Sequence, residues 1–218
     1  MRHRLTACLF AFFWAAPRAQ ADVTTDHELR LDASIRTELV DGLKVQFTQN
    51  LRQRSQRQGG RQIIPELGLS YGFLTYFSVG LGGRYSIEKD NDGASANATR
   101  VQGDLEAKSP KMGRLKASYR VRVQRETVAH DDSKIRLRNK ATLRLNTDSP
   151  VTPELFYEHT LDPNGESGHK AQKYRLGGGL AAKIDKQHRL KFRFFQDKEI
   201  DGDGDKTRVA SIGYRYSF

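Results

Sequence analysis

Apolar and polar residues alternate one by one through most of the chain. In residues 28–39, for example, Leu29, Leu31 and Ile35 are each flanked by charged or hydroxyl-bearing neighbours. A period of two is typical of a β-strand, because successive side chains along a strand point to opposite faces of the sheet. The pattern therefore predicts an all-β protein whose strands each have one apolar and one polar face.

Polar connections of two different lengths separate these alternating segments. The longer ones are predicted at residues 55–61, 89–98, 130–133, 162–172 and 199–206, and the shorter ones at 41–42, 74–75, 109–113, 148–150 and 185–186. Long and short connections take turns along the chain, as in transmembrane β-barrels with short periplasmic turns and longer extracellular loops. Segments of about ten residues are long enough for a tilted strand to cross the hydrocarbon layer. We therefore predict a single antiparallel transmembrane β-barrel.

The number of strands is less clear than their nature. Eleven segments alternate, whereas single-chain bacterial barrels have an even number of strands. We therefore expect ten to twelve strands and favour twelve, with residues 23–28 forming a short extra strand. A soluble barrel or a β-sandwich is the alternative fold, because alternation does not reveal which face of a strand points inward.

The last strand has the form of a membrane-barrel terminus. Ile212, Tyr214, Tyr216 and the final Phe218 share one side of it. An alternating aromatic strand that ends in phenylalanine resembles the closing strand of Gram-negative outer-membrane barrels. Aromatic rings are favoured where membrane meets water. The resemblance implies that the outer-membrane assembly machinery is a partner and that lipid surrounds the barrel.

The first 21 residues read as a secretory signal peptide. Arg2 and Arg4 precede an apolar run over residues 5–16, and Ala19 and Ala21 give the small-x-small cleavage pattern. The apolar run is too short to span a bilayer as a helix. We predict a signal peptide over 1–21, a barrel over 22–218 and a location in the outer membrane of a Gram-negative bacterium.

Charge adds a candidate site to this picture. The formal net charge is +11, and it falls to +8 without residues 1–21, which contain three arginines and no acid. Export argues against nucleic acid as the partner of this positive charge. On the barrel interpretation the basic residues fall on the inner side of the strands. The candidate lumen-lining residues are Arg84, Arg120, Arg122, Arg136, Arg138, Lys140, Arg144, Glu154, Glu158, Arg175, Arg189, Lys191 and Arg193.

Two functions fit a basic lumen. Rings of basic side chains favour anions, so the barrel could be a small pore for anionic solutes. The same side chains could instead form an arginine–glutamate network that fills a narrow barrel, because buried charges need partners and small barrels fill with side chains. We favour the filled barrel, although the excess of bases over acids keeps the pore interpretation open.

Chemistry at a catalytic centre is harder to find. Residues 130–133 place His130 and Ser133 together in a predicted external loop, which makes an outer-membrane surface hydrolase the alternative function. No nucleophile elbow and no metal-ligand spacing occurs in the sequence. We therefore expect no catalytic residues, no cofactor, no metal site and no enzymatic activity.

Several short stretches resemble an uncharacterised family of Gram-negative outer-membrane β-barrel proteins, which is defined by a domain of unknown function. These stretches are residues 81–85, 135–140, 153–158, 174–179 and 214–218. The resemblance implies a barrel in the outer membrane and no established activity. The terminal strand, the chain size and the basic inner side also show a weaker resemblance to small twelve-stranded porins for acidic oligosaccharides.

Overall fold

The computed structural model describes residues 25–55, 60–89, 95–128, 133–163, 170–200 and 205–218. These ranges contain eleven strands, which are β1 Thr25–Val40, β2 Leu43–Arg54, β3 Arg61–Leu74, β4 Phe77–Lys89, β5 Ser95–Lys108, β6 Leu115–Val128, β7 Lys134–Leu145, β8 Val151–Asp162, β9 Lys170–Lys183, β10 His188–Glu199 and β11 Lys206–Ser217. In the described ranges no helix is long and apolar enough to span a bilayer. The predicted signal peptide lies outside the described residues and stays a prediction.

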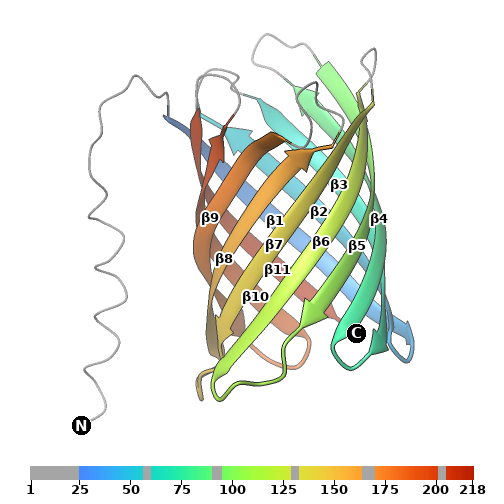
Figure 1. The fold of residues 1–218 in the computed structure, drawn as a ribbon, viewed down its shortest axis with the longest axis vertical. Coiled ribbons are helices and arrows are strands. Elements are labelled where there is room, and N and C mark those ends of the chain that lie inside the picture. The colour runs from blue at the N-terminus through green and yellow to red at the C-terminus, as the bar shows by residue number, and fades with distance from the viewer. Residues whose placement is uncertain (1–24, 56–59, 90–94, 129–132, 164–169, 201–204) are drawn as a thin grey trace.

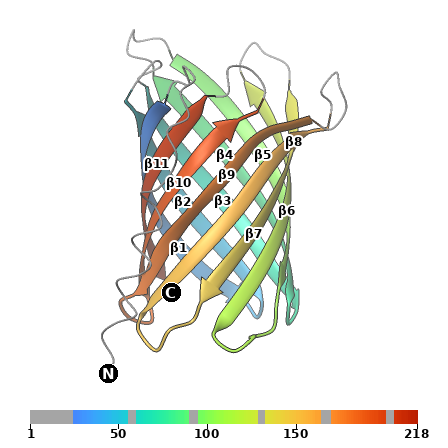
Figure 2. The same ribbon diagram turned by 60° about the vertical axis from the view of Figure 1, so that its left-hand side comes forward.

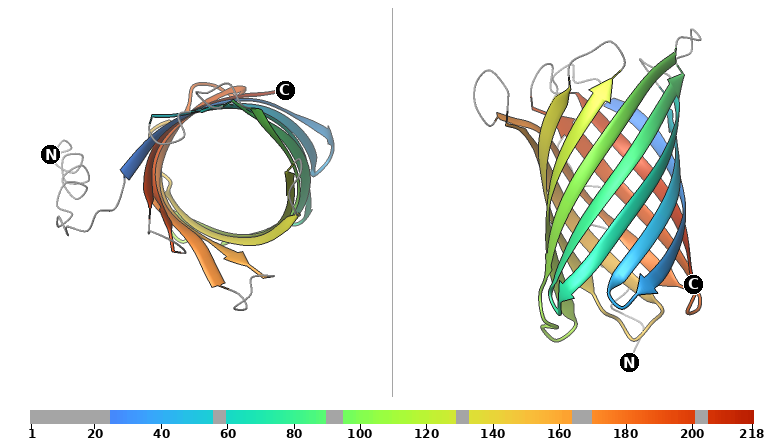
Figure 3. Two further views of the ribbon diagram at one scale, coloured as in Figure 1. Left: turned by 90° about the horizontal axis from the view of Figure 1, so that it is seen from above. Right: turned by 90° about the vertical axis from the view of Figure 1, so that its right-hand side faces the viewer.

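The strands form one closed barrel in which each strand pairs with its neighbours in sequence, as Figure 1 and the turned view in Figure 2 show. The view along the axis in Figure 3 shows the ring. These features confirm the predicted all-β barrel and the expected range of ten to twelve strands.

The preferred count of twelve is not met in the described residues, because the expected extra strand is part of β1. Thr25 to Glu28 continue the ladder of β1 and pair with Lys206 to Val209 of β11. With eleven strands running alternately up and down, the first and last strands point the same way. The barrel therefore closes through a parallel β1–β11 pair, whereas its other pairs are antiparallel.

The barrel has two distinct ends. The strand ends that flank residues 55–60, 90–94, 129–133, 163–169 and 200–205 form one end, here called the loop end. The strand ends that flank residues 41–42, 75–76, 109–114, 146–150 and 184–187 form the other, the turn end. Phe218 also lies at the turn end (Figure 1). The difference in connection length is smaller than the sequence suggests, because strands extend into the predicted loops. Ser95, for example, already pairs with Lys89.

The apolar side chains of the alternating strands point to the outside of the barrel, and the polar ones point into the lumen. Along β4 and β9, Leu81 is 66% exposed and Leu176 is 60% exposed, although both are large apolar residues. Their polar neighbours on the same strands point into the lumen. A soluble barrel would turn this face inward, so the structure contradicts that alternative. The outer wall is a continuous apolar belt.

The inner wall is crowded on one side. Phe156 of β8 and Phe195 of β10 are almost fully buried and make an edge-to-face contact, with ring centroids 5.8 Å apart. Between them runs β9, where Gly177 faces inward. A Cβ atom at Gly177 would lie 2.2 Å from Cβ of Phe195. Glycine is therefore required here by close packing, and it lets the two phenylalanine rings meet across β9.

Candidate functional site: a basic cavity in the lumen

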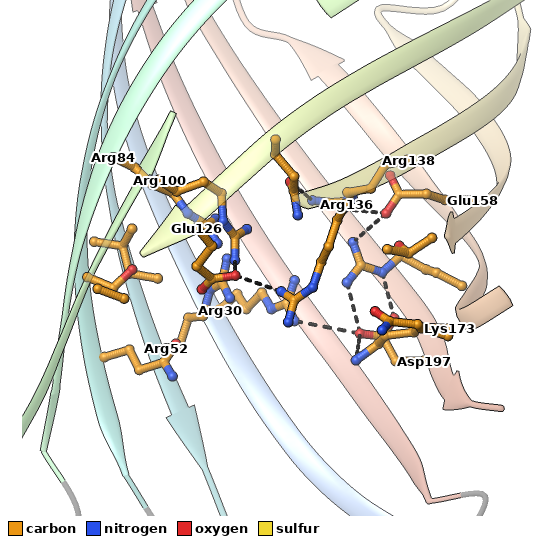
Figure 4. A pocket seen from close by; sticks show the side chains of 18 of the residues that line it. Arg30, Arg52, Arg84, Arg100, Glu126, Arg136, Arg138, Glu158, Lys173 and Asp197 are labelled. Atoms are coloured by element: carbon orange, nitrogen blue, oxygen red, sulfur yellow. Dashed lines mark hydrogen bonds and ion pairs between the residues drawn. The ribbon is translucent and has the colours of Figure 1, made fainter. Parts of the chain in front are cut away.

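A cavity of about 500 Å³ occupies the lumen toward the loop end. Its lining comes from the halves of the strands nearest the long connections and is strongly polar. Nine basic and five acidic residues line it, namely Arg30, Arg52, Arg54, Arg84, Arg100, Arg136, Arg138, Lys173, Arg175, Glu88, Glu126, Glu158, Asp197 and Glu199. Figure 4 shows most of these side chains converging on the same space. We call this space the basic cavity.

Two carboxylates on one side of the basic cavity are fully engaged. Asp197 accepts a bidentate pair from Arg175, at 2.6 Å from Nε and 2.8 Å from Nη2, and lies 3.3 Å from Nζ of Lys173. Glu158 pairs with Arg138 and lies 3.3 Å from Nη1 of Arg175. Arg30 lies 3.9 Å from Asp197 and Arg120 lies 3.8 Å from Glu158, so each acid is shared among three cations and this side has no spare negative charge.

Glu126 bridges the opposite side of the basic cavity. One of its oxygens, Oε2, lies 2.5 Å from Nη2 of Arg100 and 2.6 Å from Nη1 of Arg136. The two guanidinium groups come from different strands, β5 and β7, so the carboxylate of β6 ties three neighbouring strands together. A single acid again serves two cations. The ion pairs thus stabilise the wall but leave an excess of positive charge.

Three guanidinium groups lack part of their hydrogen bonding. The Nε atoms of Arg52, Arg84 and Arg100 are buried and have no hydrogen-bond partner within the described ranges. A fourth such atom, Oδ1 of Asp32, does not line this cavity. Buried polar groups are normally satisfied, so each exception needs an explanation. An acceptor with negative charge is the partner that a guanidinium group binds best.

The sheet register brings two of these arginines together. Arg84 of β4 lies directly opposite Arg100 of β5, on the same inward face. Residues opposite each other on neighbouring strands have Cβ atoms about 5 Å apart, and like charges in such a pair are destabilising. Glu126 pairs with Arg100 but no ion pair within the described part of the chain joins it to Arg84. The pair therefore forms a local positive charge that an anion would neutralise.

A second network of ion pairs lies in the lumen nearer the turn end. Glu154 lies 2.8 Å from Nζ of Lys191, 2.9 Å from Nε of Arg193 and 3.5 Å from Nε of Arg144. Above it, the ammonium group of Lys140 lies 4.3 Å from the ring centroid of Phe156. These groups occupy the space between the basic cavity and the turn end. Charge-assisted hydrogen bonds, which are the strong kind, join β7, β8 and β10 on this side of the wall.

The structure divides the thirteen candidate residues among several groups. Those that line the basic cavity are Arg84, Arg136, Arg138, Glu158 and Arg175. Those in the second network are Lys140, Arg144, Glu154, Lys191 and Arg193. Arg120 lies 3.8 Å from Glu158, Arg122 makes a bidentate pair with Asp104, and Arg189 lies opposite Arg215 near the turn end. A role for any of them in binding stays a prediction.

Sequence reasoning missed Arg52 and Arg100 as members of the site. Alternation places both on the polar face of their strands, but nothing else in the sequence sets them apart from the other polar residues of that face. What distinguishes Arg52 and Arg100 is a neighbour across the sheet, and only the strand register supplies that information. Lys89 pairs with Ser95, and Arg84 with Arg100, across a connection whose length the sequence overestimates.

The hydrolase alternative falls mainly outside the described residues. His130 is among the residues not described, so its distance to Ser133 is not defined. The hydroxyl oxygen of Ser133 lies 3.1 Å from that of Thr127 and accepts from Arg125 at 3.3 Å. Within the described ranges, no group of three or more His, Cys, Asp or Glu residues is placed to hold a metal ion.

The comparison with protein families is decisive for the kind of protein. Residues 30–207 match the family described as "Protein of unknown function (DUF2490)". The chain belongs to this family. The match confirms the resemblance to a barrel family of unknown function, and it spans the nine complete strands β2 to β10, most of β1 and the first residues of β11. No curated protein matches the chain.

One solved structure is similar in shape, LpxR from Salmonella typhimurium. It matches with a TM-score of 0.49 and 8% sequence identity, over 80% of this chain and 83% of LpxR. The comparison overturns the prediction that the chain is not an enzyme. That prediction is withdrawn. Because the likeness is low, it identifies no reaction and no catalytic residue in the family member described here.

Proposed function

We propose that this family member is an outer-membrane β-barrel that binds a small anionic solute in the basic cavity. The outer wall supports the membrane location. Large apolar side chains are exposed all around it, and an exposed apolar area of this extent in a folded protein marks contact with lipid or another protein. A barrel also leaves no open sheet edge, as a bilayer requires.

Aromatic side chains support the same location. Near the turn end the exposed aromatic residues are Tyr71, Phe73, Tyr76, Phe77, Tyr214 and Phe218. A girdle of aromatic residues at the edge of the apolar belt is typical of transmembrane barrels. With the turn end in the periplasm, the basic cavity lies on the external side.

The observation that carries the anion proposal is the set of unsatisfied guanidinium groups. The buried Nε atoms of Arg52, Arg84 and Arg100 need acceptors, and the acids around them are already shared. A phosphate or carboxylate would accept these bonds and separate the like charges of Arg84 and Arg100. A volume of about 500 Å³ is in the range of small-molecule sites. We expect a ligand with two or more anionic groups, such as a phosphorylated or acidic sugar.

The second network argues for binding rather than free permeation. Glu154 and its three cations come from β7, β8 and β10, on one side of the lumen between the basic cavity and the turn end. Held together by charge-assisted hydrogen bonds, these side chains narrow the path that a solute would take to the turn end. The basic cavity is thus proposed as a pocket that opens toward the loop end, above a narrowed section of lumen.

Calorimetric titration of the purified barrel in detergent tests the proposal, with tripolyphosphate as the probe. Arg84→Gln should weaken binding at least about tenfold, because a hydrogen bond to a charged group contributes about 1.5–3 kcal/mol. The matched control is Arg114→Gln, in an exposed turn where Arg114 pairs only with Asp148. Equal affinity in the three proteins, or no binding to the unmodified protein, would refute the proposal.

A further inference from the structure

Three polar side chains form a hydrogen-bonded row on the outer wall, inside the apolar belt. The hydroxyl group of Tyr119 on β6 donates to Oδ1 of Asn139 on β7, at 3.1 Å. Nδ2 of Asn139 lies 3.2 Å from Nε2 of His159 on β8. Each residue shares the outward side of its strand with apolar neighbours, such as Leu137 and Ala141 on β7. We call this row the outer-wall cluster.

The strand register holds the outer-wall cluster together. Asn139 lies directly opposite His159, and Tyr119 lies opposite Ala141, two residues further along β7. A tyrosine side chain easily covers this diagonal step between neighbouring strands. As a result Asn139 is only 9% exposed, while the Tyr119 ring that covers it is 48% exposed. The cluster is therefore a built arrangement on three successive strands rather than a chance polar residue.

The direction of these hydrogen bonds determines which atom of the outer-wall cluster is left as a donor. Oδ1 of Asn139 accepts from Tyr119, so the amide nitrogen faces His159, and an amide nitrogen can only donate. Nε2 of His159 is then the acceptor, and in the neutral ring the proton is on Nδ1. Nδ1 has no hydrogen-bond partner among the described residues. The cluster ends in one N–H donor on the apolar surface.

An N–H donor without an acceptor is energetically unfavourable on a surface covered by hydrocarbon. Polar side chains on the lipid side of a membrane protein are rare, and those present usually serve a function. His159 is three residues from the loop end of β8, so it lies about 10 Å along the strand from that end at about 3.3 Å per residue. This level is near the edge of the hydrocarbon layer, where acyl chains join their head groups through carbonyl groups.

We propose that Tyr119, Asn139 and His159 form a lipid-binding site on the outer wall, which holds an acyl carbonyl group of a membrane lipid through Nδ1–H of His159. The carbonyl oxygen accepts this hydrogen bond, and the exposed ring of Tyr157, whose centroid lies 6.0 Å from that of His159, packs beside the acyl chain. The inference rests on the proposed membrane location but not on anion binding in the lumen.

Native mass spectrometry with two matched lipids tests this site. The purified barrel is mixed with equal amounts of a diester phosphatidylethanolamine and its diether analogue, which has the same chains and head group but lacks the carbonyl groups. We expect about fivefold preferential retention of the diester, in line with the net contribution of one hydrogen bond. The preference should disappear in His159→Phe and fall in Asn139→Leu. Gln49→Leu, an outward polar residue on β2, is the control and should retain it.

A second measurement keeps the inference falsifiable if a variant folds poorly. In nanodiscs that contain lipid labelled with ¹³C at the carbonyl, solid-state NMR should show a contact between that carbon and a histidine Nδ1 of the unmodified protein. Equal retention of the two lipids, or a preference that survives in His159→Phe, would overturn the inference. So would a dimer of the chain that depends on His159, because a second copy would then be the occupant. Loss of tripolyphosphate binding with the lipid preference intact would affect only the proposed function.

Discussion

Replacing Glu158 by glutamine removes one negative charge from the most crowded part of the lumen and changes little else. The side chain of Glu158 is 4% exposed, and it pairs with Arg138 and Arg175. Arg175 keeps its bidentate partner Asp197, whereas Arg138 keeps only a 3.5 Å contact to Gln124. The variant therefore leaves the buried guanidinium group of Arg138 without its counter-charge. It also removes the longer 3.8 Å ion pair of Arg120, whose side chain is 31% exposed.

The loss of ion pairs in Glu158→Gln sets the expected loss of stability. Breaking a buried ion pair by removing one partner destabilises a protein by about 3–5 kcal/mol. The neighbouring cavity is polar and wide enough for water, so we expect the lower value, about 3 kcal/mol, which is about a hundredfold change in the unfolding equilibrium. Glu199→Gln is the matched control, because Glu199 undergoes the same chemical change where its side chain is 57% exposed. An exposed pair contributes about 0–1 kcal/mol.

Urea unfolding in lipid vesicles, followed by gel mobility of the folded barrel, measures both variants. Gel mobility is preferable to tryptophan fluorescence because the one tryptophan, Trp14, belongs to the predicted signal peptide. The free energy of unfolding should fall by about 3 kcal/mol in Glu158→Gln and by less than about 1 kcal/mol in Glu199→Gln. Equal losses in the two variants would show that the lumen network does not hold the barrel together.

Two further predictions concern packing and assembly. Gly177→Ala should destabilise the barrel by about 2–3 kcal/mol in the same unfolding assay, because the added Cβ atom would overlap Phe195. The control is Gly83→Ala, which should be neutral because a Cβ atom there meets nothing within 4 Å. Equal stability of the two variants would refute the packing argument. Phe218→Ala should reduce the folded fraction that the outer-membrane assembly machinery inserts, since the exposed Phe218 ring is presented at the turn end by a 4.8 Å contact to Tyr216. The unassisted refolding yield in detergent should not change, and an unchanged folded fraction in cells would refute the role of Phe218.

Alternation alone predicted the architecture well, because it is a local property of the chain. A period of two places Arg84 and Leu81 on opposite faces of their strand. The exposure of the apolar face was decided by the two chain ends taken together, and the structure agrees with that choice.

What alternation could not supply is the register between strands. The opposition of Arg84 and Arg100 and the contact between Asn139 and His159 depend on the lengths of connections, which polar composition predicts only loosely. A period of two places Asn139 and His159 on the apolar side of their strands, but it does not show that they are neighbours, so it could not predict their hydrogen bond. Alternation also did not predict how the barrel closes. The preference for twelve strands came from a rule about other barrels.

The parallel closure between β1 and β11 has a topological consequence. Thr25 begins β1 at the loop end, whereas Phe218 follows β11 at the turn end. In a barrel with an even number of strands, both termini emerge on one side of the bilayer. On the proposed membrane location, reporters joined just before Thr25 and just after Phe218 would here face opposite compartments, so a protease added from outside would remove one and spare the other.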